Sequence, residues 1–210
     1  METTRQITLK DAKERAARLA RIDEPHVAGL NAWVRELRRR LPEGDSVPWF
    51  DPADGGSNAQ ILWLLEAPSR RATAAHGGSG FISCDNNDQT AKNTFETRVE
   101  AGVDRSLVVH WNVIPYYIGT ASKIRTWERS DILAVQSLLE ELAELLPNVK
   151  AVIPAGDAAR AAWYGATPPR WSRLHVAHNV PHPSPQNLNT RPGSRERIVE
   201  AWSAALAACS

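Results

Sequence analysis

Short apolar runs alternate with amphipathic segments through residues 60–207, and this alternation restricts the possible folds more than any other feature of the chain. The continuous apolar run within residues 60–65 is typical of a strand buried on both faces. The predicted strands cover residues 60–65, 106–111, 149–153 and 174–177. The predicted helices among them cover residues 90–102, 130–146, 157–163 and 196–207. Strands that alternate with helices predict an α/β fold, with a mainly parallel four-stranded sheet inside three α/β/α layers.

The segment before this alternation is predicted to be helical. One helix is expected over 9–21, with Thr8 as its cap, and a second over 26–41, where apolar residues recur at helical spacing. We therefore expect an N-terminal helical extension at residues 1–47, packed on an α/β domain at residues 48–210.

Composition excludes several classes of protein. The chain has 210 residues, of which 42% are hydrophobic, so it suits one domain with a substantial core. Its two cysteines, Cys84 and Cys209, are too few for a four-cysteine zinc site, an iron–sulfur cluster or a disulfide framework. No apolar run approaches the ~20 residues that span a bilayer, and the polar first segment does not resemble a secretion signal. We expect a cytoplasmic protein with no membrane partner.

Polar side chains follow the predicted strands where ligands usually bind in α/β sheets. Glu66 follows the first strand, Asn112 ends the second and His182 follows the fourth. The carboxyl ends of parallel strands meet at one edge, so we expect these side chains to converge. Prolines on both sides of His182 stiffen its loop and fix the position of the imidazole. Asp157, after the third strand, and Thr90 are instead predicted to cap helices.

Taken in order, these motifs resemble the uracil-DNA glycosylase superfamily. That superfamily has a motif with a proline after its first strand, an aromatic residue on the next loop, an asparagine ending a middle strand, and HPSP near the C-terminus. The corresponding segments here are Glu66-Ala67-Pro68-Ser69, Phe81 in a glycine-rich loop, Asn112 and His182-Pro183-Ser184-Pro185. The resemblance covers residues 48–207, and residues 151–159 are similar to the superfamily's third strand and glycine turn. It implies the α/β/α fold and repair of DNA.

The first motif departs from the best-known family, which has Gly-Gln-Asp-Pro-Tyr. Ala67 stands where that family has the aspartate that handles water, and Ser69 stands where it has the tyrosine that rejects thymine. The run is closer to the Gly-Glu-Ala-Pro-Gly of the iron–sulfur family, whose glutamate matches Glu66, but the cluster cysteines are missing. The resemblance therefore implies a divergent member without an iron–sulfur cluster, acting without metal or organic cofactor.

The resemblance also implies roles for the site residues. His182 would donate a hydrogen bond to the O2 oxygen of the departing uracil, and Glu66 would orient water and stabilise the sugar cation. Asn112 would pair with N3–H and O4, and Phe81 would stack on the flipped base. Further uracil contacts are expected from Ala67 and Pro68. Alternative residues for positioning water are Asp85, Asn86, Asn87 and Asp88.

Contacts to the DNA backbone are expected near the C-terminus. Residues 150–210 carry seven basic and three acidic side chains, and this local excess favours phosphate. The candidate wedge residues are Gln186, Asn187 and Leu188. The candidate phosphate contacts are Ser69, Ser184, Arg191 and Arg195, with Arg70 and Arg71 as further possibilities.

The leading hypothesis is a monomeric DNA glycosylase that flips uracil out of single- or double-stranded DNA and hydrolyses its N-glycosidic bond, leaving an abasic site. Two alternatives stay open. Because alanine replaces the aspartate at Ala67, the chain could bind uracil or abasic DNA with little or no turnover. Because Ser69 leaves more room than tyrosine, the base could instead be a deaminated purine, hypoxanthine or xanthine.

Overall fold

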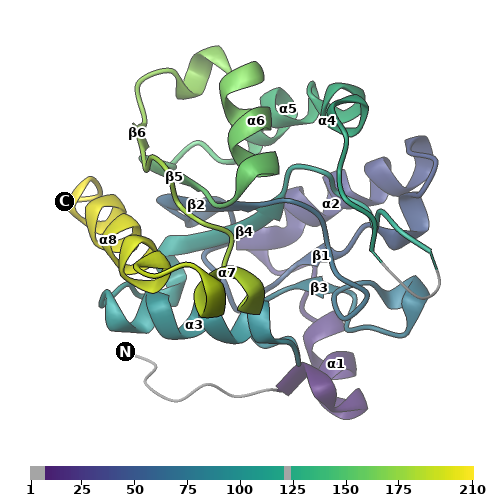
Figure 1. Cartoon of the computed structure of the whole chain (residues 1–210). Helices are drawn as coiled ribbons and strands as arrows, with labels where there is room; N and C mark the ends of the chain where they lie inside the picture. Colours follow the sequence, from purple (N-terminus) through teal and green to yellow (C-terminus); the bar gives the residue numbers. More distant parts are fainter. Residues whose placement is uncertain (1–7, 121–123) are drawn as a thin grey trace.

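A parallel sheet forms the centre of the protein. The computed structural model describes residues 8–120 and 124–210. Within these residues the main sheet has four strands, all parallel, in the order β4-β2-β5-β6 (Figure 1). The strands are β2 (Ile61–Leu65), β4 (Val108–Asn112), β5 (Ala151–Pro154) and β6 (His175–Val176). The predicted α/β fold with a parallel sheet and N-terminal helices is confirmed.

Side chains alternate along β2 and pack into a separate apolar layer on each face of the sheet. Leu62 and Leu64 face one layer, and Ile61 and Trp63 face the other. The helices of the first layer are α2 (Pro25–Arg40), α4 (Arg129–Val135), α5 (Leu138–Leu145) and α6 (Asp157–Gly165). The helices on the opposite side are α8 (Ser194–Ala207) and, packed beside it, α3 (Gln89–Glu100).

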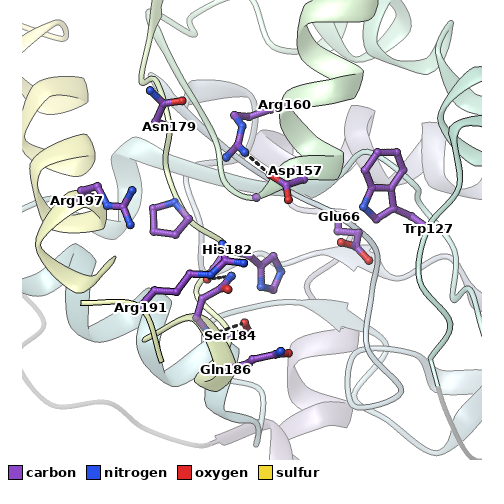
Figure 2. A pocket seen from close by; sticks show the side chains of 13 residues that line it. Glu66, Trp127, Asp157, Arg160, Asn179, His182, Ser184, Gln186, Arg191 and Arg197 are labelled. Carbon is purple, nitrogen blue, oxygen red and sulfur yellow. Dashed lines mark hydrogen bonds and ion pairs between the residues drawn. The ribbon is translucent and has the colours of Figure 1, made fainter. Parts of the chain in front are cut away.

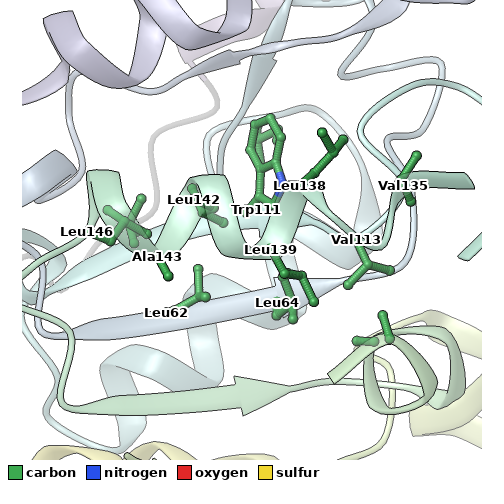
Figure 3. Packing of buried hydrophobic residues seen from close by; sticks show 14 of the residues in the cluster. Leu62, Leu64, Trp111, Val113, Val135, Leu138, Leu139, Leu142, Ala143 and Leu146 are labelled. Atoms are coloured by element: carbon green, nitrogen blue, oxygen red, sulfur yellow. The ribbon is translucent and has the colours of Figure 1, made fainter. Parts of the chain in front are cut away.

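Large aromatic and leucine side chains fill both layers. Trp63 stacks on Trp202 of α8 with ring centroids 4.4 Å apart, which joins the C-terminal helix to the middle strand. On the other face, Figure 3 shows Leu139 and Leu142 of α5 packed above β2 and beside Trp111 of β4. Both faces of the sheet are therefore covered around the middle strand β2, as its unbroken apolar run predicted.

Several helix boundaries differ from prediction for local reasons. The N-cap of α1 (Ala12–Leu19) is Asp11, whose carboxylate accepts two backbone N–H groups, and not Thr8. Asp88, rather than Thr90, caps α3 in the same way. At α6 the N-cap is Gly156, and Asp157 is the first helical residue, so its predicted capping role is wrong. The helix predicted over 130–146 is divided into α4 and α5.

Some elements were not predicted at all. Two-residue strands β1 (Trp49–Phe50) and β3 (Phe81–Ile82) pair in parallel as a small separate sheet, and α7 (Pro185–Thr190) follows His182. Short 3-10 segments lie at Thr8–Lys10, Gly44–Ser46, Gly56–Asn58, Ala74–His76, Arg105–Leu107 and Pro169–Trp171. Elements this short lack the length over which a periodic pattern can be recognised.

The N-terminal helices are joined to the rest of the fold in two ways. Leu30 and Val34 of α2 belong to the same buried cluster as the sheet residues. Arg18 of α1 forms ion pairs with Asp51 and Asp85, both almost fully buried. The proposed division between 1–47 and 48–210 stays a prediction. No helix within the described residues combines the length and apolar character needed to cross a bilayer.

The packing of α5 on the sheet can be tested by a pair of leucine substitutions. Leu142 is completely buried, whereas Leu133 of α4 is 58% exposed. We expect Leu142→Ala to lower the free energy of unfolding by about 2–5 kcal/mol, since it leaves a cavity. Leu133→Ala should change it by about 0.5 kcal/mol or less. Urea unfolding measures both, and equal losses in the two variants would contradict this account of the core.

Candidate functional site

The carboxyl ends of the strands surround a cavity of about 410 Å³, here called the inner cavity. Glu66 after β2, Asn112 at the end of β4 and His182 before α7 all line it. Leu65 and Asn112 are partners in the β2–β4 register, so Glu66 and the amide start from the same level of the sheet. The predicted convergence of a carboxylate, an amide and an imidazole is therefore present.

Other predicted residues line the same cavity. These are Ala67, Pro68, Ser69, Asn86, Asp88, Ser184 and Gln186. Asn86 donates a hydrogen bond to the Phe81 carbonyl at 2.9 Å, and Asp88 accepts from the backbone N–H of Ala91. Both side chains thus shape the cavity wall as well as being candidates for positioning water.

The Asn112 side chain is available for a ligand. It is 2% exposed, and its amide makes no hydrogen bond with the part of the chain that the structure describes. Buried polar groups in proteins are nearly always paired, so an unpaired amide in a cavity wall indicates a partner that enters the cavity. An amide offers one donor and one acceptor side by side.

The His182 imidazole is held by packing against a glycine. Gly156 has a φ of +94°, and a Cβ there would lie 3.0 Å from the His182 Cβ, so both the backbone and the contact require glycine. The loop is fixed by Asn187, which donates to the His182 carbonyl at 3.1 Å, and by Asn93, which donates to the Pro183 carbonyl at 2.7 Å. The backbone that carries the imidazole is therefore held in place on both sides of the Gly156 contact.

Electrostatics keep the His182 ring neutral. Burial lowers its pKa to about 4, because the imidazolium form loses its hydration. Near neutral pH the ring then has one N–H donor and one acceptor nitrogen. Burial, with a smaller contribution from Asp157, also raises the pKa of Glu66. The site thus contains a neutral hydrogen-bond donor and a carboxyl group that ionises less readily than one in water.

A second, more polar cavity of about 500 Å³ adjoins the first and is called the outer groove. Glu66, His182, Ser184 and Gln186 line both cavities, so they form a shared wall. Figure 2 shows Arg191 and Arg197 on one side of His182, with Glu66 and Trp127 on the opposite side. The groove therefore places exposed guanidinium groups beside the entrance to the inner cavity.

Sequence reasoning missed several residues of the outer groove. Arg160, Arg197, Trp127 and Asn179 line it. Arg160 forms an ion pair with Asp157 and donates to the Val180 carbonyl at 3.2 Å. The local basic excess after residue 150 was a signal for these arginines, but nothing in the sequence distinguished those that face the groove.

Phe81 and Leu188 lie elsewhere than the predicted roles require. Phe81 is 1% exposed in β3 and is not among the residues that line the inner cavity, whereas the adjacent Ile82 is. Leu188 packs against the apolar cluster beneath α8, so its side chain is not a free wedge. Of the wedge candidates, Gln186 is exposed and lines both cavities, while Asn187 braces the His182 loop.

Two charged candidates are engaged in ion pairs away from the cavities. Asp85 is buried, pairs with Arg18 and Arg105, and does not line the inner cavity. Arg195 pairs with Glu96 and Glu100 of α3 and does not line the outer groove. Asp85, which the sequence suggested for positioning water, is therefore paired with arginines. Arg195, which it suggested for binding DNA, is paired with glutamates.

The burial of His182 predicts a specific pH dependence. Its imidazole should titrate with a midpoint near pH 4 in nuclear magnetic resonance spectra of the folded chain. Above pH ~6.5 the ring is neutral in both folded and unfolded chains. As the pH falls from about 6.5 towards about 4, only the unfolded chain takes up the proton, so stability should decrease. His182→Asn should lack this part of the pH dependence, and a midpoint near 6.5 would contradict the burial.

Comparison with known proteins assigns no family. No family model matches the chain, and no curated protein is significantly similar to it. What the site can do chemically therefore follows from its own side chains, their burial and the two cavities that they form.

Proposed function

We propose that the protein is a DNA glycosylase that removes uracil from DNA by base flipping and leaves an abasic site. The observation that carries this proposal is the convergence of Glu66, Asn112 and His182 on one cavity from three distant segments. Their order along the chain is that of the resemblance described above. The proposed setting is the cytoplasm, with single- or double-stranded uracil-containing DNA as the partner.

The chemistry requires opposite charges to be stabilised at two places. Cleavage of the N-glycosidic bond develops negative charge on the base and positive charge on the sugar. A neutral His182, positioned by Gly156, can donate its N–H to the base oxygen as negative charge grows there. Asn112, buried and unpaired among the described residues, can read the polar edge of the base.

Glu66 is positioned for the sugar side of the reaction. It lies in the wall shared by the inner cavity and the outer groove, where the sugar would sit between a flipped base and the DNA backbone. Its carboxylate would stabilise the sugar cation and orient the attacking water. Ala67, next along the chain, lines the inner cavity with a methyl group and offers no second carboxylate.

The outer groove provides for the DNA backbone. Arg160, Arg191 and Arg197 line it, and guanidinium groups suit phosphate oxygens. Gln186 lies at the boundary of the two cavities, so its side chain could fill the space that a flipped base leaves in the duplex. These contacts hold the substrate without reading its sequence.

A uracil-containing oligonucleotide tests the reaction directly. After incubation with the protein and heating in alkali, strand cleavage at the uracil is expected. His182→Ala should lose a factor on the order of 10² or more in rate, as for removal of an oxyanion donor. His178→Ala is the matched control, because His178 contacts Tyr164 and lies outside both cavity linings.

Parallel substrates with hypoxanthine and xanthine show whether the base is a deaminated purine instead. Uracil-DNA that binds tightly but is never cleaved would favour the binding-protein alternative. Absence of both binding and cleavage for every base would refute the proposed function.

If the outer groove binds DNA, Arg191 and Arg195 should contribute differently to the salt dependence of DNA binding. Arg191 is exposed and lines the groove, whereas Arg195 is held by Glu96 and Glu100. Arg191→Ala should weaken DNA binding equally for all sequences and reduce the slope of log K against log salt by about 1. Arg195→Ala should leave that slope nearly unchanged. Fluorescence anisotropy at several salt concentrations measures both slopes, and a larger effect of Arg195 would contradict this placement of the DNA.

A further inference from the structure

A second histidine, His110, lines the inner cavity together with His182. His110 lies on β4 two residues before Asn112, so the two side chains share one face of the strand. Its Nδ1 lies 2.7 Å from Oδ2 of Asp54, and its side chain is 3% exposed. Its Nε2 is buried and has no hydrogen-bond partner among the described residues.

The arrangement shows which way the His110 ring is turned. Asp54 does not line the inner cavity, whereas His110 does. The Nδ1 edge of the ring therefore faces Asp54 behind the cavity wall, and Nε2, on the opposite edge, is enclosed in the wall of the inner cavity. Native proteins rarely leave a buried polar atom unpaired, so this nitrogen indicates a hydrogen-bond partner that arrives with a ligand.

Asp54 also fixes the tautomer of the ring. Arg105 Nε donates to Oδ1 of Asp54 at 2.7 Å. Burial raises the pKa of Asp54, but His110 and Arg105 outweigh this effect and lower it to about 2. An ionised carboxylate can only accept hydrogen bonds, so Nδ1 of His110 must carry the hydrogen. In the neutral ring Nε2 is then an acceptor, and it becomes a donor only if the ring is protonated to the imidazolium.

We propose that His110 is a specificity-determining residue of the inner cavity, whose Nε2 accepts a hydrogen bond from a ring N–H on the polar edge of the bound base. The neighbouring Asn112 amide donates to the adjacent carbonyl oxygen. The class of ligand, a base with a ring N–H beside a carbonyl such as uracil, rests on the proposed function.

This assignment explains how the site would distinguish uracil from cytosine. No described residue holds the Asn112 amide, so a half-turn would let it match either base. The neutral His110 ring cannot exchange its donor and acceptor nitrogens in this way, because Asp54 holds its tautomer. Cytosine has a lone pair on N3 where uracil has N–H, so two acceptors would face each other and cytosine is disfavoured.

Free bases test this role separately from catalysis. The full chain labelled with ¹⁵N-histidine is titrated with uracil and, in parallel, with cytosine. Uracil should shift the Nε2 resonance of His110 in the direction of an accepted hydrogen bond, and cytosine should not. His110→Phe, which keeps an aromatic ring but no acceptor, should bind uracil on the order of 10-fold more weakly.

A pair of aspartate variants tests the tautomer. In Asp54→Asn the new amide can donate to Nδ1, so Nε2 can carry the hydrogen and the preference for uracil over cytosine should fall on the order of 10-fold. Asp51→Asn is the matched control, because Asp51 is also buried and paired with Arg105 but does not contact His110. It should leave the preference unchanged, and thermal unfolding shows whether each variant is folded.

The outcomes separate the two proposals. Uracil binding that shifts the His182 signals but not Nε2 of His110, or an unchanged affinity of His110→Phe for uracil, overturns the role of His110 and leaves the glycosylase function standing. No binding of uracil, together with no binding or cleavage of DNA that carries any of the tested bases, overturns both. If Asp54→Asn does not fold, the titration of the unaltered chain and His110→Phe decide the question alone.

Discussion

The backbone pairing of β2 with β4 on one side and β5 on the other is the constraint on which the site depends. The pairs Leu65–Asn112 and Leu64–Pro154 end the three strands at nearly the same level, and the Ile114 N–H continues the pairing by donating to the Glu66 carbonyl at 2.9 Å. A slip of one residue would turn Asn112 to the opposite face and into the apolar layer under α5. The packing of leucine and tryptophan side chains on both faces makes that slip costly, so the hydrophobic core also sets the geometry of the polar cavity.

The parts of the fold that the sequence predicts correctly are those encoded by local periodicity. Short segments rich in apolar residues correctly predicted all four strands of the sheet, and the carboxyl-end rule correctly predicted that Glu66, Asn112 and His182 line one cavity. The helix boundaries that the sequence predicts wrongly depend on which of several nearby polar side chains caps the helix. Asp88 caps α3 in place of Thr90 because its carboxylate accepts from the Ala91 backbone N–H.

The sequence does not predict side-chain positions and contacts that depend on tertiary packing. Leu188 could be a wedge or a core residue, and only the position of α8 decides that it packs inward. The contact between Asp54 and His110 joins residues 56 positions apart, with no motif that connects them. The same is true of Arg18 and Arg105, which share Asp51 and Asp85 and so bring α1, the loop after β1 and the segment before β4 together. Long-range pairs of this kind follow from the fold and leave little trace in composition or spacing.

The wall that Glu66, His182, Ser184 and Gln186 share between the two cavities has a thermodynamic consequence. If a ligand in one cavity moves these four side chains, it changes the affinity of the other cavity for its own ligand. Thermodynamic linkage then requires the reverse effect to have the same factor. A single ligand long enough to occupy both cavities would contact both sides of this wall.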